Sequence, residues 1–307
     1  MRKFRTICRS GVLKPVLVGL ILLCSVGKAC ATNNWLGGTV LGLHLGGSGD
    51  WNTAGNWSNG NVPTTSDDVV ISELLAGFTI SLSGPATAKS ISINTTIALL
   101  TGVVINTSGQ TLTVANSLNV GAVSILLATP LTITGSGAVT LNNAINVYPY
   151  ANLTFSSGTN VTISGATVTC YNNSTINCNG TLSANSSIFN ISGSNSGIAN
   201  TGTFNLGTAS TINLTGTSAS VSNTGTFTLL SNVTGSATIG PISSGTTGFS
   251  GQYSVQRFFT GGSTYSNGRW VYRNYRLMSS PVNAGLVSGN YPYTLNYVAA
   301  SAIVSGA

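Results

Sequence analysis

Few side chains in this sequence could carry acid–base or metal chemistry. The only histidine is His44, and it lies between glycine-rich stretches. The four acidic residues all lie near the N-terminus: Asp50, Asp67, Asp68 and Glu73. A Ser-His-Asp arrangement would need His44 and one of the aspartates, and a single histidine is too few for a histidine-based metal site. We therefore interpret His44 as a loop residue and predict no catalytic residue, no metal ligand and no cofactor.

The adjacent pair Asp67 and Asp68 is the one cluster of carboxylates. Calcium takes six to eight oxygen ligands, so two neighbouring carboxylates are few for a calcium site. A structural role at the start of a strand is the better interpretation of this pair.

Enzymes that act on polysaccharides need more ionisable groups than the middle of this chain contains. Glycoside hydrolysis uses two carboxylates that flank the bond, and lyase chemistry uses acidic calcium ligands with a base nearby. The segment 90–256 contains no Asp, Glu, Lys, Arg or His. The sequence therefore predicts a protein that is not an enzyme. The alternative is a fragment of a polysaccharide lyase or hydrolase whose site lies in a terminal segment or in a missing part of the gene.

A net charge of +7 is typical of proteins that bind nucleic acid, but here the cations are unevenly distributed along the chain. Six of the 11 cations lie in the first 28 residues: Arg2, Lys3, Arg5, Arg9, Lys14 and Lys28. The rest of the chain then holds five cations against four acids. Without a basic patch the attraction to phosphates has no source, so we exclude nucleic acid as a partner.

Residues 1–31 have the features of a secretory signal peptide. A basic segment is followed by the apolar run Pro15–Val26 and by small residues around Cys30. This run is too short to span a bilayer, and no later segment is a transmembrane candidate. We expect export, a mature chain that begins at Thr32, and a secreted or cell-surface location. An uncleaved anchor, or a lipoprotein attached through Cys30, are the alternatives.

Cleavage would leave two cysteines, Cys170 and Cys178. In an exported chain they could form a disulfide that closes a small loop. They could equally be two buried thiols that pack as small apolar side chains. The sequence leaves both interpretations open.

Short β-strands must position all of these residues. Between residues 79 and 240, apolar side chains recur at a spacing of two in segments such as Thr79–Leu82 and Thr211–Leu214, separated by Gly, Ser, Asn and Thr. This spacing is typical of strands, and no segment has a sustained helical pattern.

A repeat of 23 residues then predicts how the strands are arranged. The segment Asn200–Phe204, N-T-G-T-F, recurs as Asn223–Phe227. Three strands of about seven residues make one coil of that length, which is the arithmetic of a parallel β-solenoid. We predict an all-β protein with about seven coils of about 22 residues, stacked about 4.8 Å apart. A compact β-sandwich with tight hairpins is the alternative.

The composition of the chain predicts four regions. They are a signal peptide at 1–31, an N-terminal cap and entry strand at 32–78, solenoid repeats at 79–248, and a C-terminal β module at 249–307. The ends of a solenoid must be capped, because exposed strand edges invite pairing with other chains. The last region also gathers cations and aromatics that could form a carbohydrate-stacking face or, as we prefer, a cation–π-stabilised module: Arg257, Arg269, Trp270, Tyr272, Arg273, Tyr275 and Arg276.

Two segments carry a family resemblance. The segment 49–63, G-D-W-N-T-A-G-N-W-S-N-G-N-V-P, followed by D-D-V-V-I at 67–71, resembles the entry segment of bacterial extracellular β-helix proteins of the adhesin and autotransporter-like kind. The resemblance implies that the tryptophans cover the first coil and that the aspartates direct the chain into its first strand. The expected cap residues are Trp51, Trp57, Asp67 and Asp68.

The second resemblance lies near the C-terminus. The segments V-Q-R-F at 255–258, G-R-W at 268–270 and Y-R-L-M-S-S-P-V at 275–282 are similar to the module that follows such repeats in large Bacteroidetes surface proteins exported by type IX secretion. Those proteins usually end in a sorting domain, and this chain stops at Ala307 without one. We therefore expect a truncated product or a fragment.

These features predict a secreted or cell-surface structural protein of the adhesin type. Its polar Thr/Ser/Asn-rich solenoid would contact glycans or other cell-surface molecules. Ice binding is a less favoured alternative, based on Thr-X-Thr pairs at 111/113, 132/134, 201/203 and 226/228. These pairs do not fall at a constant spacing along the sequence.

Overall fold

A computed structural model describes residues 32–37, 39–40, 43–44, 47–73, 77–95, 102–121, 129–258, 263–266 and 269–272. The chain forms two compact units, Met1–Phe258 and Phe259–Ala307. The predicted signal peptide and most of the second resemblance lie outside the described residues. The second unit contains an antiparallel hairpin of β27 (Ser263–Ser266) and β28 (Arg269–Tyr272).

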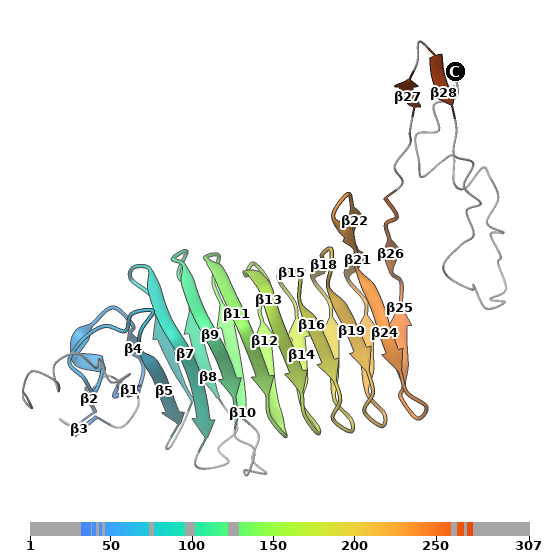
Figure 1. Ribbon diagram of the computed structural model, residues 1–307. Helices are drawn as coiled ribbons and strands as arrows, with labels where there is room; N and C mark the ends of the chain where they lie inside the picture. The colour runs from blue at the N-terminus through green and yellow to red at the C-terminus, as the bar shows by residue number, and fades with distance from the viewer. Residues whose placement is uncertain are drawn as a thin grey trace, which may run out of the picture. The chain divides into compact units, whose positions relative to one another are not determined.

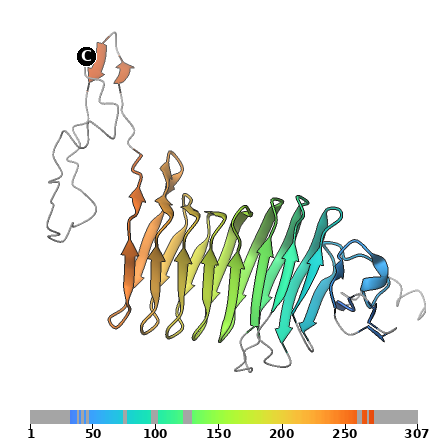
Figure 2. The same cartoon turned by 180° about the vertical axis from the view of Figure 1, so that it is seen from behind.

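The first unit is a parallel β-solenoid, as the sequence predicted (Figures 1 and 2). Asn200 pairs with Asn223 and Phe204 with Phe227, so the 23-residue repeat is one coil. The chain makes about seven turns of roughly 23 residues. Successive coils pair through parallel strands, which excludes the antiparallel sandwich.

One side of the solenoid, called the first face, is a nine-stranded parallel sheet. Its strands, from the N-terminal end, are β4 (Gly49–Asp50), β6 (Phe78–Ser81), β8 (Val103–Asn106), β10 (Thr129–Thr134), β12 (Ala151–Phe155), β14 (Thr175–Cys178), β17 (Gly197–Asn200), β20 (Ser220–Asn223) and β25 (Gly248–Gly251).

The other sheet has 13 strands and bends around a corner, so that it forms two faces. Long strands run through the corner in the early coils: β7 (Ala86–Thr95), β9 (Leu112–Val120), β11 (Ala138–Val147) and β13 (Asn160–Cys170). The second face continues through β15 (Thr181–Asn185), β18 (Thr203–Leu206), β21 (Thr226–Leu229) and β26 (Ser254–Val255). The third face begins with β1 (Thr32–Asn34) and β5 (Asp68–Glu73) and continues through β16 (Ile188–Ile191), β19 (Thr211–Leu214) and β24 (Thr238–Ile242).

Three small elements lie outside these faces. They are the hairpin of β2 (Thr39–Val40) and β3 (Leu43–His44), the 3-10 helix η1 (Ala54–Asn56), and the hairpin of β22 (Ser231–Asn232) and β23 (Gly235–Ser236). The second hairpin lies between β21 and β24 in the sequence and lengthens the last coil.

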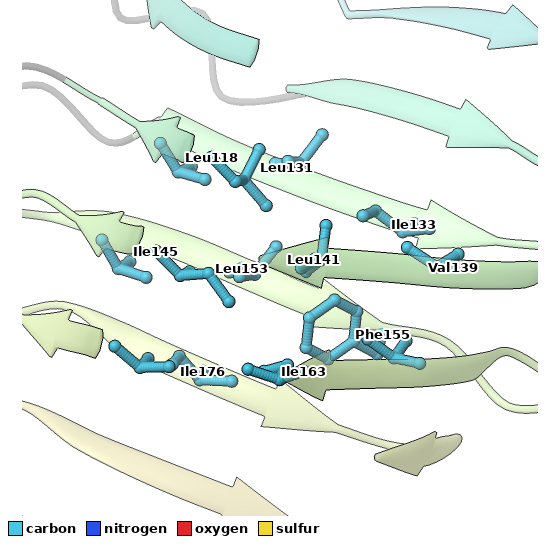
Figure 3. Packing of buried hydrophobic residues seen from close by; sticks show 14 of the residues in the cluster. Leu118, Leu131, Ile133, Val139, Leu141, Ile145, Leu153, Phe155, Ile163 and Ile176 are labelled. Atoms are coloured by element: carbon cyan, nitrogen blue, oxygen red, sulfur yellow. The ribbon is translucent and has the colours of Figure 1, made fainter. Parts of the chain in front are cut away.

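The core consists of columns of like side chains, one from each coil. Leu131, Leu153 and Ile176 stack along the first face, and Leu118 and Ile145 stack along the third, as Figure 3 shows. All five are at most 2% exposed. The alternation of buried and outward residues is the period-two pattern of the sequence.

The corners between faces use glycine for close approach. Gly180, Gly202 and Gly225 occupy corresponding positions in three coils, and a Cβ on Gly225 would lie 2.2 Å from the carbonyl oxygen of Gly202. Positive φ angles occur elsewhere, at other glycines such as Gly158 and at non-glycine residues such as Asn173 and Ala209, with φ of 55° and 57°. The glycines therefore permit contact between coils rather than unusual backbone angles at these three positions.

Candidate functional surfaces

The expected cap residues form the N-terminal end of the solenoid. Trp51 and Trp57 are at most 1% exposed, and their rings meet edge to face with centroids 4.8 Å apart. Trp35 packs on Trp57 from the other side at 4.9 Å. The indole N–H of Trp57 donates to the carbonyl oxygen of Trp51 at 2.7 Å. Three tryptophans thus shield the core at the N-terminal end of the described coils.

Asp67 and Asp68 have structural partners. The Asp67 carboxylate accepts hydrogen bonds at 2.7 Å from both the backbone N–H and the hydroxyl of Thr64, which closes the turn before β5. Asp68 begins β5, accepts a hydrogen bond from Ser90 at 2.5 Å and forms an ion pair with Lys89 at 2.9 Å. The hydroxyl of Ser90, followed by Lys89, lowers the pKa of Asp68 below its ordinary 3.8. This geometry agrees with a role at the start of the strand.

The other described aspartate is similarly occupied. Asp50, at the end of β4, accepts hydrogen bonds from the N–H and hydroxyl of Ser83 and from the hydroxyl of Thr53. Burial acts to raise the pKa of Asp50, but these hydrogen bonds outweigh it and the pKa lies below 3.8. Asp50 and Asp68 belong to different sheets. Among the described residues no group of three His, Cys, Asp or Glu side chains could hold a metal ion.

His44 lies in the β2–β3 hairpin, where its backbone pairs with Thr39. Its side chain lies outside the described atoms. Of the basic and aromatic set near the C-terminus, Arg257 is exposed, and Arg269, Trp270 and Tyr272 lie in β28. The remaining members of that set lie outside the described residues.

The two cysteines are free, buried thiols, which corresponds to the second interpretation of this pair. Cys170 ends β13 and Cys178 ends β14, so they belong to different sheets and point into the core. Burial raises the pKa of each thiol to about 12. At neutral pH they are protonated and act as small apolar side chains.

The outward side of the second face carries two columns of side chains, most of them with hydroxyl groups, here called the threonine array. Backbone pairing aligns one column from coil to coil: Thr87, Thr113, Thr140, Thr162, Ser183, Asn205, Thr228 and Ser254. A second column lies two residues earlier in each strand: Ala138, Asn160, Thr181, Thr203 and Thr226. The array is uncharged and follows the solenoid axis.

The alignment shows where the predicted Thr-X-Thr pairs lie. Thr113 and Thr228 belong to one column, whereas Thr203 pairs with Thr226 and belongs to the other, so the pairs do not stack on one another as pairs. Coil length varies, because Val103 pairs with Leu131 whereas Leu131 pairs with Leu153. Constant spacing in sequence is therefore not required for constant spacing in space. The 132/134 pair lies on the first face instead.

The outward side of the third face carries asparagine ladders. The Asn146 amide donates to the Asn119 side-chain oxygen at 2.9 Å, and Asn213 donates to Asn190 at 2.8 Å. An amide has both a donor and an acceptor, so stacked asparagines satisfy one another. These groups stabilise the stack of coils.

Two tyrosines stack at the end of the third face. Tyr148 and Tyr171 directly follow β11 and β13, and their rings lie 5.1 Å apart with an interplanar angle of 22°. Both are half-buried. Burial, and then the neighbouring Tyr171, raises the pKa of Tyr148. Sequence reasoning missed this pair, although the two tyrosines are one coil length apart.

A scan of family models and searches of curated proteins and solved structures found no match to this chain. No helix among the described residues has the length and apolar character needed to cross a bilayer.

Proposed function

We propose that this is an exported, non-enzymatic structural protein of the adhesin type that contacts glycans through the polar exterior of its solenoid. The observation that carries the proposal is a long parallel solenoid whose outward side chains are uncharged from residue 90 to residue 256 and are mostly hydroxyls and amides. Each coil presents outward hydroxyls and amides, so weak contacts can be made many times along one molecule. Repeated contacts raise the overall affinity without any single strong site.

The resemblance at 49–63 and 67–71 supports export to the cell surface. Two of the residues that it implied, Trp51 and Trp57, are buried and pack edge to face at the N-terminal end of the described coils. We include in the proposal a bacterial, Bacteroidetes-type origin and type IX export of the complete gene product.

The tyrosine pair is the best candidate for a glycan contact. Tyr148 and Tyr171 offer stacked rings with polar hydroxyl tips, and tyrosine is favoured at interfaces because its ring is apolar while its hydroxyl bonds to polar partners. Asn146, two residues before Tyr148, donates from its side-chain amide to the side-chain oxygen of Asn119 in the ladder and is partly exposed. A sugar ring placed on the tyrosines would find a polar neighbour within the same coil.

The test is a glycan array and a cell-adhesion assay with residues 32–307. We expect binding to neutral glycans that is insensitive to salt, because the coils between residues 90 and 256 carry no charge to be screened. Tyr171→Ala should weaken this binding, and Thr162→Ala, on the second face, is the matched control. An absence of binding to glycans and to cells would leave only a spacer role. Binding lost at high salt would assign the contact to the basic C-terminal residues instead.

A further inference from the structure

We propose that the threonine array on the second face binds ice. This inference goes beyond the proposed contact with glycans and uses a different face of the solenoid.

The hydroxyls of the array are free to bind an external partner. Within the described part of the chain, the threonine hydroxyls at 113, 140, 162, 203, 226 and 228 make no hydrogen bond to the protein. The third face differs, because Asn119 and Asn146 satisfy one another there. A hydroxyl that the protein leaves unpaired is instead hydrogen-bonded to water.

The positions of the array are regularly spaced in two directions, and hydroxyls stand at both positions of a strand at Thr181 and Ser183 and at Thr226 and Thr228. Neighbouring coils are about 4.8 Å apart, and side chains two residues apart on one strand are about 6.6 Å apart. The register is unbroken across Thr140, Thr162 and Ser183. Water molecules held by such a grid are themselves held at fixed, repeating distances.

The side chains of the array are also rigid. Threonine is β-branched and has restricted χ1 freedom, and its neighbours in a strand reduce that freedom further. Little side-chain entropy is then lost when the array engages a surface, so a larger share of the contact energy appears as affinity. The methyl group of each threonine adds apolar contact between the hydroxyls.

A crystal lattice is the partner that can use all of these groups together. Multivalent binding gains affinity only when the geometry allows simultaneous engagement. A lattice of water molecules repeats in two dimensions, as the array does, and its surface is made of hydrogen-bond donors and acceptors without charge. A single flexible glycan chain cannot meet two columns over several coils at once, and the described part of the array holds no aromatic ring for a sugar to stack on.

The sequence offers a matched pair of variants on one strand. Thr162 and Thr167 both lie in β13 and are both exposed, but Thr162 belongs to the array on the second face whereas Thr167 lies on the third. A lysine at either position adds the same long, charged side chain. Only Thr162→Lys would hold the array away from a flat surface.

The experiment measures thermal hysteresis and inhibition of ice recrystallisation with residues 32–307. Wild-type protein should shape ice crystals and inhibit recrystallisation. Thr162→Lys should raise by about tenfold the protein concentration needed to inhibit recrystallisation. This is a modest part of the affinity gain that simultaneous binding of many groups provides. Thr167→Lys should match wild type, and circular dichroism should show both variants folded.

Several results would overturn the inference. No ice activity in the wild-type protein would do so without any variant, and so would equal losses in the two lysine variants. Retention on crystalline cellulose or chitin with no effect on ice would assign the array to a polysaccharide surface instead. Because Tyr171→Ala should affect glycan binding and leave ice activity unchanged, this test can fail while the proposed function stands.

Discussion

Replacement of Gly202 by alanine is the sharpest test of how the coils stack. A Cβ at this position would lie 2.2 Å from the carbonyl oxygen of Gly180 and 2.6 Å from the backbone of Asn179. Ordinary contacts begin near 3.4 Å, so the two coils would have to separate by about 1.2 Å at this corner. Both neighbours are backbone atoms, and neither can rotate away as a flexible side chain could.

The cost follows from what this separation breaks. Gly202 N–H donates to the carbonyl oxygen of Cys178 at 3.0 Å, and Thr203 N–H donates to that of Gly180 at 2.8 Å. Loss of two such bonds costs about 1 kcal/mol each, and the crowding itself costs about 1–3 kcal/mol. We expect Gly202→Ala to lower the free energy of unfolding by about 3–5 kcal/mol.

The assay combines urea denaturation, followed by far-ultraviolet circular dichroism, with hydrogen exchange. Solenoid coils interact mainly with their neighbours, so the damage should centre on one region and the Thr203 amide should exchange faster. Gly55→Ala is the matched control, because Gly55 is exposed and a Cβ there meets nothing within 4 Å. If the two variants unfold at the same urea concentration, the corner backbones are not in contact and the stacked geometry is wrong.

Three further predictions follow from individual side chains. Cys170 and Cys178 should resist alkylation at pH 8 in the native protein and react in urea, and rapid alkylation of the native protein would contradict their burial. Burial raises the pKa of both thiols in the folded state to about 12. The free energy of unfolding should therefore fall as the pH rises from 9 towards 12. The pKa of Asp68 is lowered, so its contribution to stability is present above pH 3.8 and is lost as the pH falls through its folded value. The melting temperature should therefore drop less on acidification in Asp68→Asn than in wild type, and an equal drop would argue against the contacts with Ser90 and Lys89. Ala209 has a φ of 57°, so Ala209→Gly should stabilise the protein by about 0.5–1 kcal/mol in denaturant titrations, and destabilisation would show that this corner does not need a left-handed backbone.

The architecture could be predicted because two independent patterns in the sequence indicate it. Alternating apolar residues give the strands, and the repeat at Asn200 and Asn223 gives the length of a coil. The cap could be predicted as well, since acids and tryptophans are concentrated where a solenoid must end. In each case the pattern is local or repeats at one offset in the sequence. The strands, the coil length and the cap can therefore be predicted without knowing which residues of neighbouring coils are paired.

The surfaces could not be predicted, because they depend on that register. From Leu131 to Leu153 one coil takes 22 residues, and from Val103 to Leu131 it takes 28. A scan at one fixed offset therefore scatters residues that lie in one column. The corners show a related limit: glycines such as Gly158 adopt positive φ, but so does Ala209, and Gly202 instead permits close approach between coils.

The scarcity of charge follows from the stacking itself. In a solenoid each outward residue has its counterpart from the next coil about 4.8 Å away, so a column of like charges would repel along its whole length. Neutral residues avoid this repulsion. They form two kinds of column, one whose side chains hydrogen-bond to one another and one whose side chains do not. Asparagine amides at 190 and 213 pair with one another. Threonine hydroxyls at 140 and 162 remain unpaired and turn to the solvent. Stacking of like residues thus stabilises the third face through asparagine ladders. It leaves the hydroxyls of the second face free to bind a partner whose surface repeats as regularly as the coils.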